Sequence, residues 1–168
     1  MKRQPITLPY TGEAKRMGSN RIRKISENDR AKVASMMKAF YESPAVNSNG
    51  PEEIFQNNIS TCIEGSPYAS GYVFTRDDDS VCGYAMLAHS YSTEFGRPAV
   101  WIEDIYIEED MRGTGLADEF FSLVKAEYPK HIHRLEAEHD NYRAIHSYEK
   151  NEFEKMPYLE MIRFPDKK

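Results

Sequence analysis

A short stretch with two glycines, residues 110–118, constrains the fold of this chain more than any other part of its sequence. An apolar run at 100–107 precedes it and predicts a strand, and apolar residues recur at helical spacing between 117 and 128. Where a strand leads through such a turn into a helix, the N–H groups of the first helical turn point outward and carry partial positive charge. The order of these elements predicts an anion-binding turn, with a plain structural turn as the alternative.

The residues of this turn suit the close approach of a phosphate group. Gly113 and Gly115 allow a positive φ angle, and Arg112 adds a cation at the mouth of the turn. The Rossmann fingerprint fails here, because it requires a third glycine where residue 118 is aspartate. The Walker pattern fails as well, because no Gly-Lys-Ser/Thr sequence follows.

The composition is that of a globular domain with a sizeable core. Of 168 residues, 40% are hydrophobic and 29% are charged, and no apolar run is long enough to span a membrane. A net charge of −5 argues against nucleic acid as a partner and is compatible with a cationic substrate. Cys62 and Cys82 lie in apolar segments, and no Cys/His spacing resembles a metal site. We therefore expect free thiols, no metal and a cytoplasmic protein without a signal peptide.

The hydrophobic pattern predicts a single domain at 21–168 after a flexible extension at 1–20. Strands joined by hairpins in the middle of the chain, and through helices later, predict an α/β (α+β mixed) fold. We expect a mixed, mostly antiparallel sheet of seven strands, flanked by about four helices. The expected strands are 21–25, 71–75, 81–89, 100–107, 134–138, 153–156 and 159–164, and the helices lie around 33–40, 51–63, 117–128 and 144–149.

Two motifs in the second half of the chain occur together in a known family. Residues 112–117 read Arg-Gly-Thr-Gly-Leu-Ala, and residues 141–150 place Asn141, Ala144 and Tyr148 at the spacing Asn-x-x-Ala-x-x-x-Tyr. The first resembles the pyrophosphate motif, and the second the tyrosine helix, of the GNAT superfamily of acetyl-CoA-dependent N-acetyltransferases. The expected element order agrees with that family from about residue 21 to 164. One departure is Glu152-Phe153, where the family usually has Gly-Phe.

The resemblance implies acetyl-CoA as the donor and assigns cofactor contacts to the motif positions. The turn would hold the coenzyme A pyrophosphate, and the pantetheine arm would run beside residues 105–107, where a backbone amide would polarise the thioester oxygen. Asn141 and Ala144 would lie along the same arm. The implied cofactor-binding residues are Ile105, Tyr106, Ile107, Arg112, Gly113, Thr114, Gly115, Leu116, Ala117, Asn141, Ala144 and Tyr148.

Acetyl transfer to an amine also needs an acid for the leaving thiolate and a base for the amine. Tyr148 is the implied acid, because the family tyrosine at this position commonly has that role and a phenol is neutral at pH 7. Glu103 and Asp104 are candidate bases, because charged groups in an apolar strand are costly unless paired or functional. Alternation places them on opposite faces unless a bulge intervenes. A similar Glu-Asp pair in spermidine/spermine N-acetyltransferases favours Glu103, directly or through water.

These residues predict an enzyme that acetylates the primary amine of a small molecule of polyamine, thialysine or amino-acid type. A peptide or protein amine is the second candidate, and a non-catalytic acyl-CoA-binding regulatory module is the third. Glu136 and Glu138 are expected on one strand face. The favoured interpretation is a solvated face, and the alternative is a source of negative potential for a cationic amine. The resemblance also leaves a homodimer open, and it places Tyr41, Tyr91 and Phe95 on segments that line the acceptor cleft.

Overall fold

The computed structural model of the protein describes residues 21–44, 46 and 50–165, so the predicted extension at 1–20 lies outside the described residues. In this part of the chain, five strands form one sheet in the order β1-β2-β3-β4-β5. Neighbours from β1 to β4 are antiparallel, and β5 is parallel to β4, which confirms the predicted mixed sheet. The strands are β1 (Ile22–Lys24), β2 (Ala69–Thr75), β3 (Val81–Ser92), β4 (Arg97–Ile107) and β5 (Ile132–Leu135).

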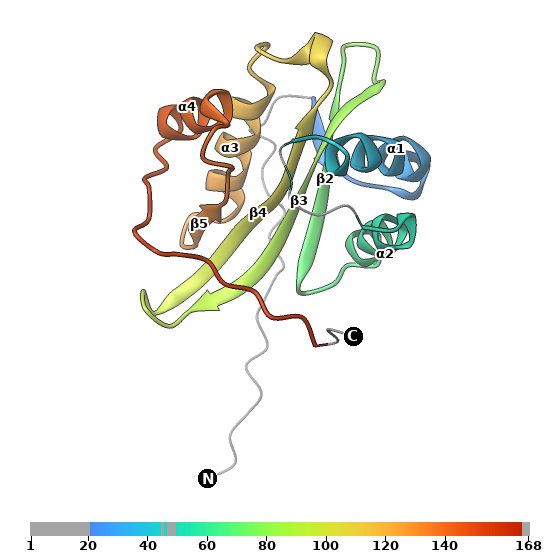
Figure 1. The fold of residues 1–168 in the computed structure, drawn as a ribbon. Coiled ribbons are helices and arrows are strands. Elements are labelled where there is room, and N and C mark those ends of the chain that lie inside the picture. The colour runs from blue at the N-terminus through green and yellow to red at the C-terminus, as the bar shows by residue number, and fades with distance from the viewer. Residues whose placement is uncertain (1–20, 45, 47–49, 166–168) are drawn as a thin grey trace.

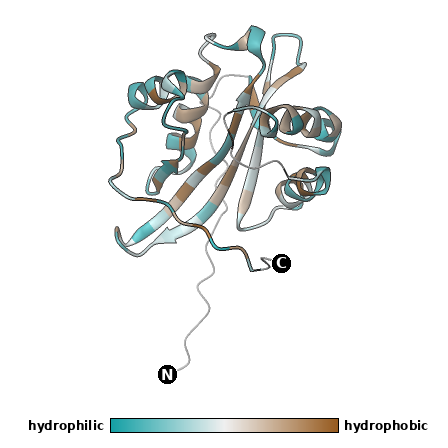
Figure 2. Cartoon of the chain, in the orientation of Figure 1, coloured by the Kyte–Doolittle hydropathy of each residue, from teal (hydrophilic) through white to brown (hydrophobic). Residues whose placement is uncertain are grey.

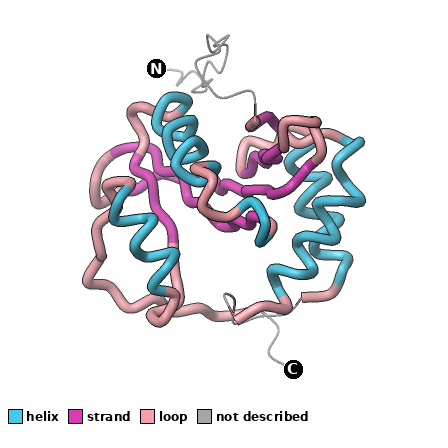
Figure 3. The backbone as a smooth tube through the Cα atoms, turned by 90° about the horizontal axis from the view of Figure 1, so that it is seen from above, coloured by secondary structure: helices cyan, strands magenta, loops and turns pink. Residues whose placement is uncertain are grey.

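Four α-helices of the described chain cover the two faces of this sheet (Figure 1). α1 (Arg30–Tyr41) and α2 (Glu52–Ile63) lie against one face, and α3 (Leu116–Glu127) and α4 (Tyr142–Lys150) lie against the other. The view from above shows the sheet between these two pairs of helices (Figure 3). None of the helices in the described ranges combines the length and the apolar character needed to cross a membrane.

Each pair of helices closes a hydrophobic core of its own. The core on the α3 side includes Leu87 and Phe120, and the core on the α1–α2 side includes Met37 and Tyr84. Figure 2 shows hydrophobic residues along the central strands and many hydrophilic residues on the helices. The central strands are therefore buried on both faces, as their apolar sequences predict.

A β-bulge in β4 determines which side chains enter each core. Met86 of β3 pairs with Asp104, but the next residue, Leu87, pairs with Ile102, so Glu103 is an extra residue in β4. An extra residue reverses the alternation of all side chains beyond it. The side chains that pack on the α3 side are Ile102, Ile105 and Ile107, and those on the α1–α2 side are Asp104 and Tyr106.

The two strands predicted at 153–156 and 159–164 are not strands in the structure, so the sheet has five strands in the described chain where seven were expected. These residues instead run as an extended segment across the surface (Figure 1). Pro157 has no N–H to donate and separates the two runs. The large apolar side chains beyond it face solvent, with Leu159 85% and Met161 87% exposed. Phe153 packs against the core on the α3 side, but residues 154–164 have no buried face with which to pair to the sheet.

Candidate active site

The turn between β4 and α3 adopts the backbone conformation that its glycines allow. Gly113 has a φ of 82° and Gly115 a φ of 90°, in the left-handed region that residues with a Cβ atom rarely adopt. Gly115 is the N-cap residue of α3, and no side chain among the described residues caps this end of the helix. The N–H groups of the first turn are therefore available to a ligand, and the helix dipole favours an anion there.

Arg112 supplies the cation of this turn. Its Nε atom donates a hydrogen bond of 2.8 Å to the carbonyl oxygen of Ile107 at the end of β4, which holds the side chain across the turn. Its guanidinium carbon lies 6.0 Å from the centroid of the Tyr106 ring. No ion pair within the described ranges involves Arg112, because the nearby carboxylates pair with other cations.

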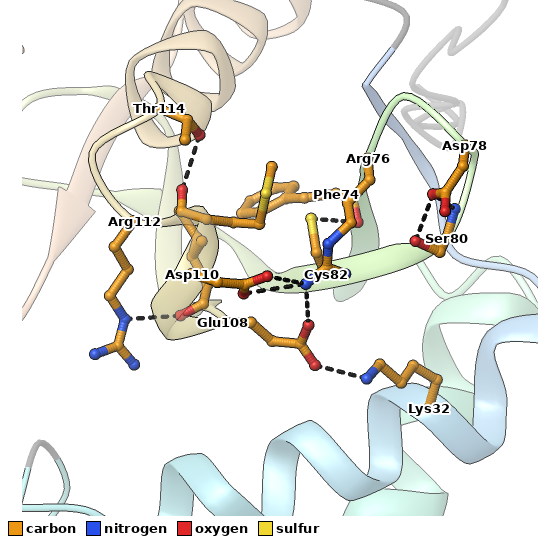
Figure 4. A network of polar contacts seen from close by, with 12 residues as sticks. Lys32, Phe74, Arg76, Asp78, Ser80, Cys82, Glu108, Asp110, Arg112 and Thr114 are labelled. Atoms are coloured by element: carbon orange, nitrogen blue, oxygen red, sulfur yellow. Dashed lines mark hydrogen bonds and ion pairs between the residues drawn. The ribbon is translucent and has the colours of Figure 1, made fainter.

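Those carboxylates belong to Glu108 and Asp110, which flank the turn (Figure 4). Nη2 of Arg76 lies 2.8 Å from Oε2 of Glu108 and 2.8 Å from Oδ2 of Asp110, and Nζ of Lys32 lies 2.6 Å from Oε1 of Glu108. The hydrogen bond from Arg76 holds the pKa of the Asp110 carboxyl below its usual value. Because both carboxylates are engaged, the turn keeps its positive character around the helix N-terminus.

β4 loses its neighbour β5 directly before the bulge. The parallel ladder begins with Ala99 opposite Ile132 and ends with Ile102 opposite Leu135. From there to Ile107, the one strand of the described chain that pairs with β4 is β3. The stretch at 105–107 therefore presents an unpaired strand edge, to which an extended ligand can hydrogen-bond.

α4 carries the second motif and is tied to α3 at its far end. Asn141 caps α4, because its side-chain oxygen accepts a hydrogen bond of 3.2 Å from the backbone N–H of Ala144. Oδ2 of Asp118 lies 2.6 Å from Nζ of Lys150, and Oδ1 accepts a hydrogen bond of 2.8 Å from Asn151. These contacts hold the two motifs in a fixed relation to each other.

Tyr148 projects from α4 into the aromatic packing on the α3 side of the sheet. Its ring makes edge contacts with Phe121 and Phe153, at centroid distances of 5.9 and 6.2 Å. Burial raises the pKa of its phenol, which stays neutral at pH 7. No charged side chain in the described ranges contributes to this shift, and a neutral phenol can act as a proton donor.

The bulge directs Asp104 into the protein and leaves Glu103 at the surface. Asp104 is 4% exposed and accepts hydrogen bonds from the hydroxyl groups of Tyr41, at 3.1 Å, and Tyr84, at 3.3 Å. Burial raises the pKa of the Asp104 carboxyl to about 6, although both hydrogen bonds lower it. Loss of hydration, and then the Glu160 carboxylate, raise the pKa of Glu103.

Two further carboxyl groups were predicted to share a strand face, and one of them, Glu136, lies near the bulge. Glu136 and Glu138 are in the loop after β5 and not on a strand face as predicted, because β5 ends at Leu135. Burial, and then a hydrogen bond with Glu160 of the C-terminal segment, raise the pKa of Glu136 to about 7. Repulsion from Glu103 raises it further, so these side chains create a region of negative potential.

The sequence pattern of the acetyltransferase (GNAT) family matches residues 33–153, which is more than half of the chain. The chain belongs to the GNAT family. The family resemblance of the two motifs is thereby confirmed, and the protein is an acetyltransferase that uses acetyl-CoA as its donor. No curated protein sequence matches this chain.

Solved structures share the fold of this GNAT acetyltransferase at low sequence identity. A "possible acetyltransferase" from Clostridium difficile 630 has a TM-score of 0.71 and 19% identity, over 86% of this chain and 96% of that chain. AAC(6′)-Iy in complex with the bisubstrate analogue CoA-S-monomethyl-acetylneamine has a TM-score of 0.70 and 14% identity, over 86% and 97% of the two chains. A ribosomal-protein-alanine N-acetyltransferase from Brucella melitensis biovar Abortus 2308 has a TM-score of 0.66 and 17% identity, over 85% and 97%. At these identities the likeness shows the fold alone.

In this GNAT acetyltransferase the candidate catalytic side chains lie on different sides of the sheet. Tyr148 is on the α3–α4 side, Asp104 is on the α1–α2 side, and Glu103 lies at the bulge between them. Of the aromatic residues assigned to the acceptor cleft, Tyr41 contacts Asp104. The other two, Tyr91 and Phe95, are 63% and 44% exposed around the β3–β4 hairpin.

Sequence reasoning missed two residues that shape this site. Tyr84 gave no signal beyond an apolar strand, although its hydroxyl group holds Asp104. Arg76 follows β2, and its two carboxylate partners lie 32 and 34 residues away in the sequence. Only the pairing of the strands brings such groups together, so a sequence pattern could not have found them.

Proposed function

We propose that this acetyltransferase transfers the acetyl group of acetyl-CoA to the primary amine of a small cationic molecule, of polyamine, thialysine or amino-acid type. The observation that carries the proposal is the buried Asp104 carboxylate, which forms no ion pair with any side chain in the described ranges. Glu103, Glu136 and Glu160 add negative charge near the same bulge. A protonated amine is the kind of ligand that such a region attracts.

The donor is proposed to bind along the unpaired edge of β4 and the turn that follows. The N–H groups at residues 113–117 and the Arg112 side chain would hold the pyrophosphate, and backbone groups of residues 105–107 would contact the pantetheine arm. An N–H group of that edge would polarise the thioester oxygen. Asn141 and Ala144 would flank the arm from the start of α4.

The chemistry requires a neutral amine and a protonated leaving group. We favour Asp104 over Glu103 as the base, because its pKa of about 6 leaves it ionised at pH 7 and still basic enough to accept a proton. The amine nitrogen then attacks the thioester carbonyl carbon, and the carbon–sulfur bond breaks. Tyr148 donates its proton to the thiolate and recovers one from the nitrogen of the adduct.

An acetyl-transfer screen tests this proposal. Purified protein with acetyl-CoA is offered spermidine, thialysine, free amino acids, an aminoglycoside and peptides with a free N-terminus, and products are identified by mass. We expect acetylation of one or more small amines, with peptides slower. Tight binding of coenzyme A without turnover of any amine would contradict the proposal and favour a non-catalytic acyl-CoA-binding module. Turnover of peptides alone would move the proposal to a peptide or protein amine.

A further inference from the structure

The hydroxyl groups around Asp104 differ in their access to solvent. Its carboxylate is 4% exposed and contacts the phenols of Tyr41 and Tyr84, with no ion pair to a cation in the part of the chain that the structure describes. An isolated buried carboxylate is costly, so its retention indicates a partner that arrives from outside. That partner must reach the carboxylate from the surface of the protein.

Tyr84 cannot provide this route. It lies in the middle of β3, is 0% exposed, and stacks against Tyr106 at a centroid distance of 6.1 Å. Its hydroxyl group therefore connects Asp104 only to the interior of the protein. Its hydrogen bond holds the carboxylate in place from the interior side of the protein.

Tyr41 lies between the carboxylate and the surface. It is the last residue of α1 and is only half-buried, and its hydroxyl group lies 3.1 Å from Oδ1 and 3.4 Å from Oδ2 of Asp104. Its ring is held by Phe40 and Phe55, at centroid distances of 5.4 and 5.3 Å. Burial and the Asp104 charge raise the pKa of its phenol, so the hydroxyl group stays protonated as a donor.

We propose that the acceptor ammonium group binds against Tyr41 on the α1 side of β4 and passes its proton through the Tyr41 hydroxyl group to the Asp104 carboxylate. The inference rests on the proposed function and identifies the acceptor side of that site. The cluster of aromatic rings that includes the two phenols on Asp104 suits this ligand, because a cation is attracted to the faces of aromatic rings in a dry environment. Those rings belong to Phe40, Tyr41, Phe55, Tyr84 and Tyr106.

The proton transfer balances as a concerted relay. The amine nitrogen gives a proton to the Tyr41 oxygen while the Tyr41 hydroxyl proton moves to an oxygen of Asp104, so the phenol is neutral before and after. The free amine attacks the thioester carbon and the carbon–sulfur bond breaks. Sulfur takes a proton from Tyr148, and Tyr148 recovers one from the nitrogen of the adduct. Asp104 returns its proton to solvent by the reverse path after the product leaves.

The titratable groups that face Asp104 come from every element packed around it. They are Tyr41 of α1, Cys62 of α2, Tyr84 of β3 and Glu103 of β4. Burial raises the pKa of Asp104 to about 6, so the relay is blocked at low pH and opens as the pH rises through that value. Loss of either phenol removes a hydrogen bond from the carboxylate and moves this limb to higher pH.

The test compares Tyr41→Phe with Tyr84→Phe, since both remove one hydroxyl group from Asp104. The probes are ethylamine, which is protonated at pH 7, and trifluoroethylamine, which is neutral at pH 7 because its fluorines withdraw charge. For ethylamine on the pH plateau above the Asp104 limb, where the amine in solution is still protonated, we expect Tyr41→Phe to lower kcat by about 10²-fold, the usual effect of losing a proton-transfer group. We expect Tyr84→Phe to keep the kcat of the wild type on the plateau of the pH profile and to move only the acidic limb of that profile to higher pH. For trifluoroethylamine, both variants should approach the wild-type rate, because no proton needs to leave the amine before it attacks.

Asp104→Asn is a second variant, in case Tyr41→Phe disturbs the end of α1. We expect it to lower kcat with ethylamine and to approach the wild-type rate with trifluoroethylamine. An equal loss with both amines would show a structural role for Tyr41 and overturn the relay, as would an unchanged kcat with ethylamine. The relay also fails if the wild type acetylates neither probe. Failure of the proposed function is distinct, because the wild type would then acetylate no amine in the screen. Coenzyme A affinity and thermal stability of each variant establish that it is folded.

Discussion

Ile102 of β4 pairs with Leu135 of β5, and this pair is the last of the parallel ladder. The next residue, Glu103, is the bulge that reverses the alternation of side chains between the two faces of β4. The strand therefore loses its neighbour and changes its alternation at the same place. An unpaired edge for the donor and a buried carboxylate for the acceptor amine consequently lie within a few residues of each other.

Gly115→Ala should weaken coenzyme A binding, because an alanine at a φ of 90° is strained and would displace the N–H groups at the start of α3. Strain of about 1–2 kcal/mol corresponds to roughly tenfold weaker binding, measured by calorimetry. Gly96→Ala is the matched control, because Gly96 has a φ of 63° in the β3–β4 hairpin and a Cβ atom meets open space at both positions. Equal coenzyme A affinities for the two variants would contradict the placement of the pyrophosphate.

Arg112→Gln should raise the KM for acetyl-CoA by about tenfold, the effect of losing one charge-assisted contact to a phosphate. S-acetylpantetheine has no pyrophosphate, so its KM should not change. Steady-state kinetics with the two donors separates these cases. An equal rise in the KM for both donors would mean that Arg112 acts through Ile107 and the end of β4, and not on the pyrophosphate.

Tyr148→Phe should lower kcat by about 10²–10³-fold with little change in the KM for acetyl-CoA, because the thiolate loses its proton donor. The phenylalanine ring keeps the contacts with Phe121 and Phe153, so thermal stability should be unchanged. Tyr142→Phe, on the same helix and 76% exposed, is the control and should behave like the wild type. A Tyr148→Phe enzyme with full activity would remove Tyr148 from the mechanism.

Asp104→Asn should stabilise the fold at pH 7 while it removes activity. Because burial raises the folded pKa from 3.8 to about 6, the folded protein holds the proton more tightly than the unfolded chain does. Asp104 by itself therefore lowers the stability of the wild type as the pH rises from about 4 through 6, on the order of 1–3 kcal/mol. Other carboxyl groups titrate in the same range in both proteins, so the measurement is the difference between them: in urea unfolding, the variant should gain this amount of stability relative to the wild type between pH 4 and pH 7. A variant less stable than the wild type at pH 7 would show that the carboxylate stabilises the fold.

Features that depend on neighbouring residues could be predicted from the sequence. The strand at 100–107, the glycine turn and the helix after it follow from periodicity and from the conformational freedom of Gly113 and Gly115, and the structure shows each of them. The capping of α4 by Asn141 is local in the same way. The fold class followed from the order of such elements.

Features that depend on pairing could not be predicted. The position of the bulge at Glu103 is set by the register between β3 and β4, which no local pattern reveals. The contact between Tyr41 and Asp104 joins residues 63 positions apart. The C-terminal runs look like strands in sequence, but the structure leaves them outside the sheet, and Glu136 lies in a loop because β5 ends at Leu135.

The most direct test of this account is the acetylation of a small primary amine by the purified protein with acetyl-CoA. The account predicts an amine product heavier by one acetyl group, released with an equal amount of coenzyme A thiol, at a rate that Asp104→Asn and Tyr148→Phe both reduce. It would be contradicted by a protein that binds acetyl-CoA and leaves every small amine in the screen unmodified.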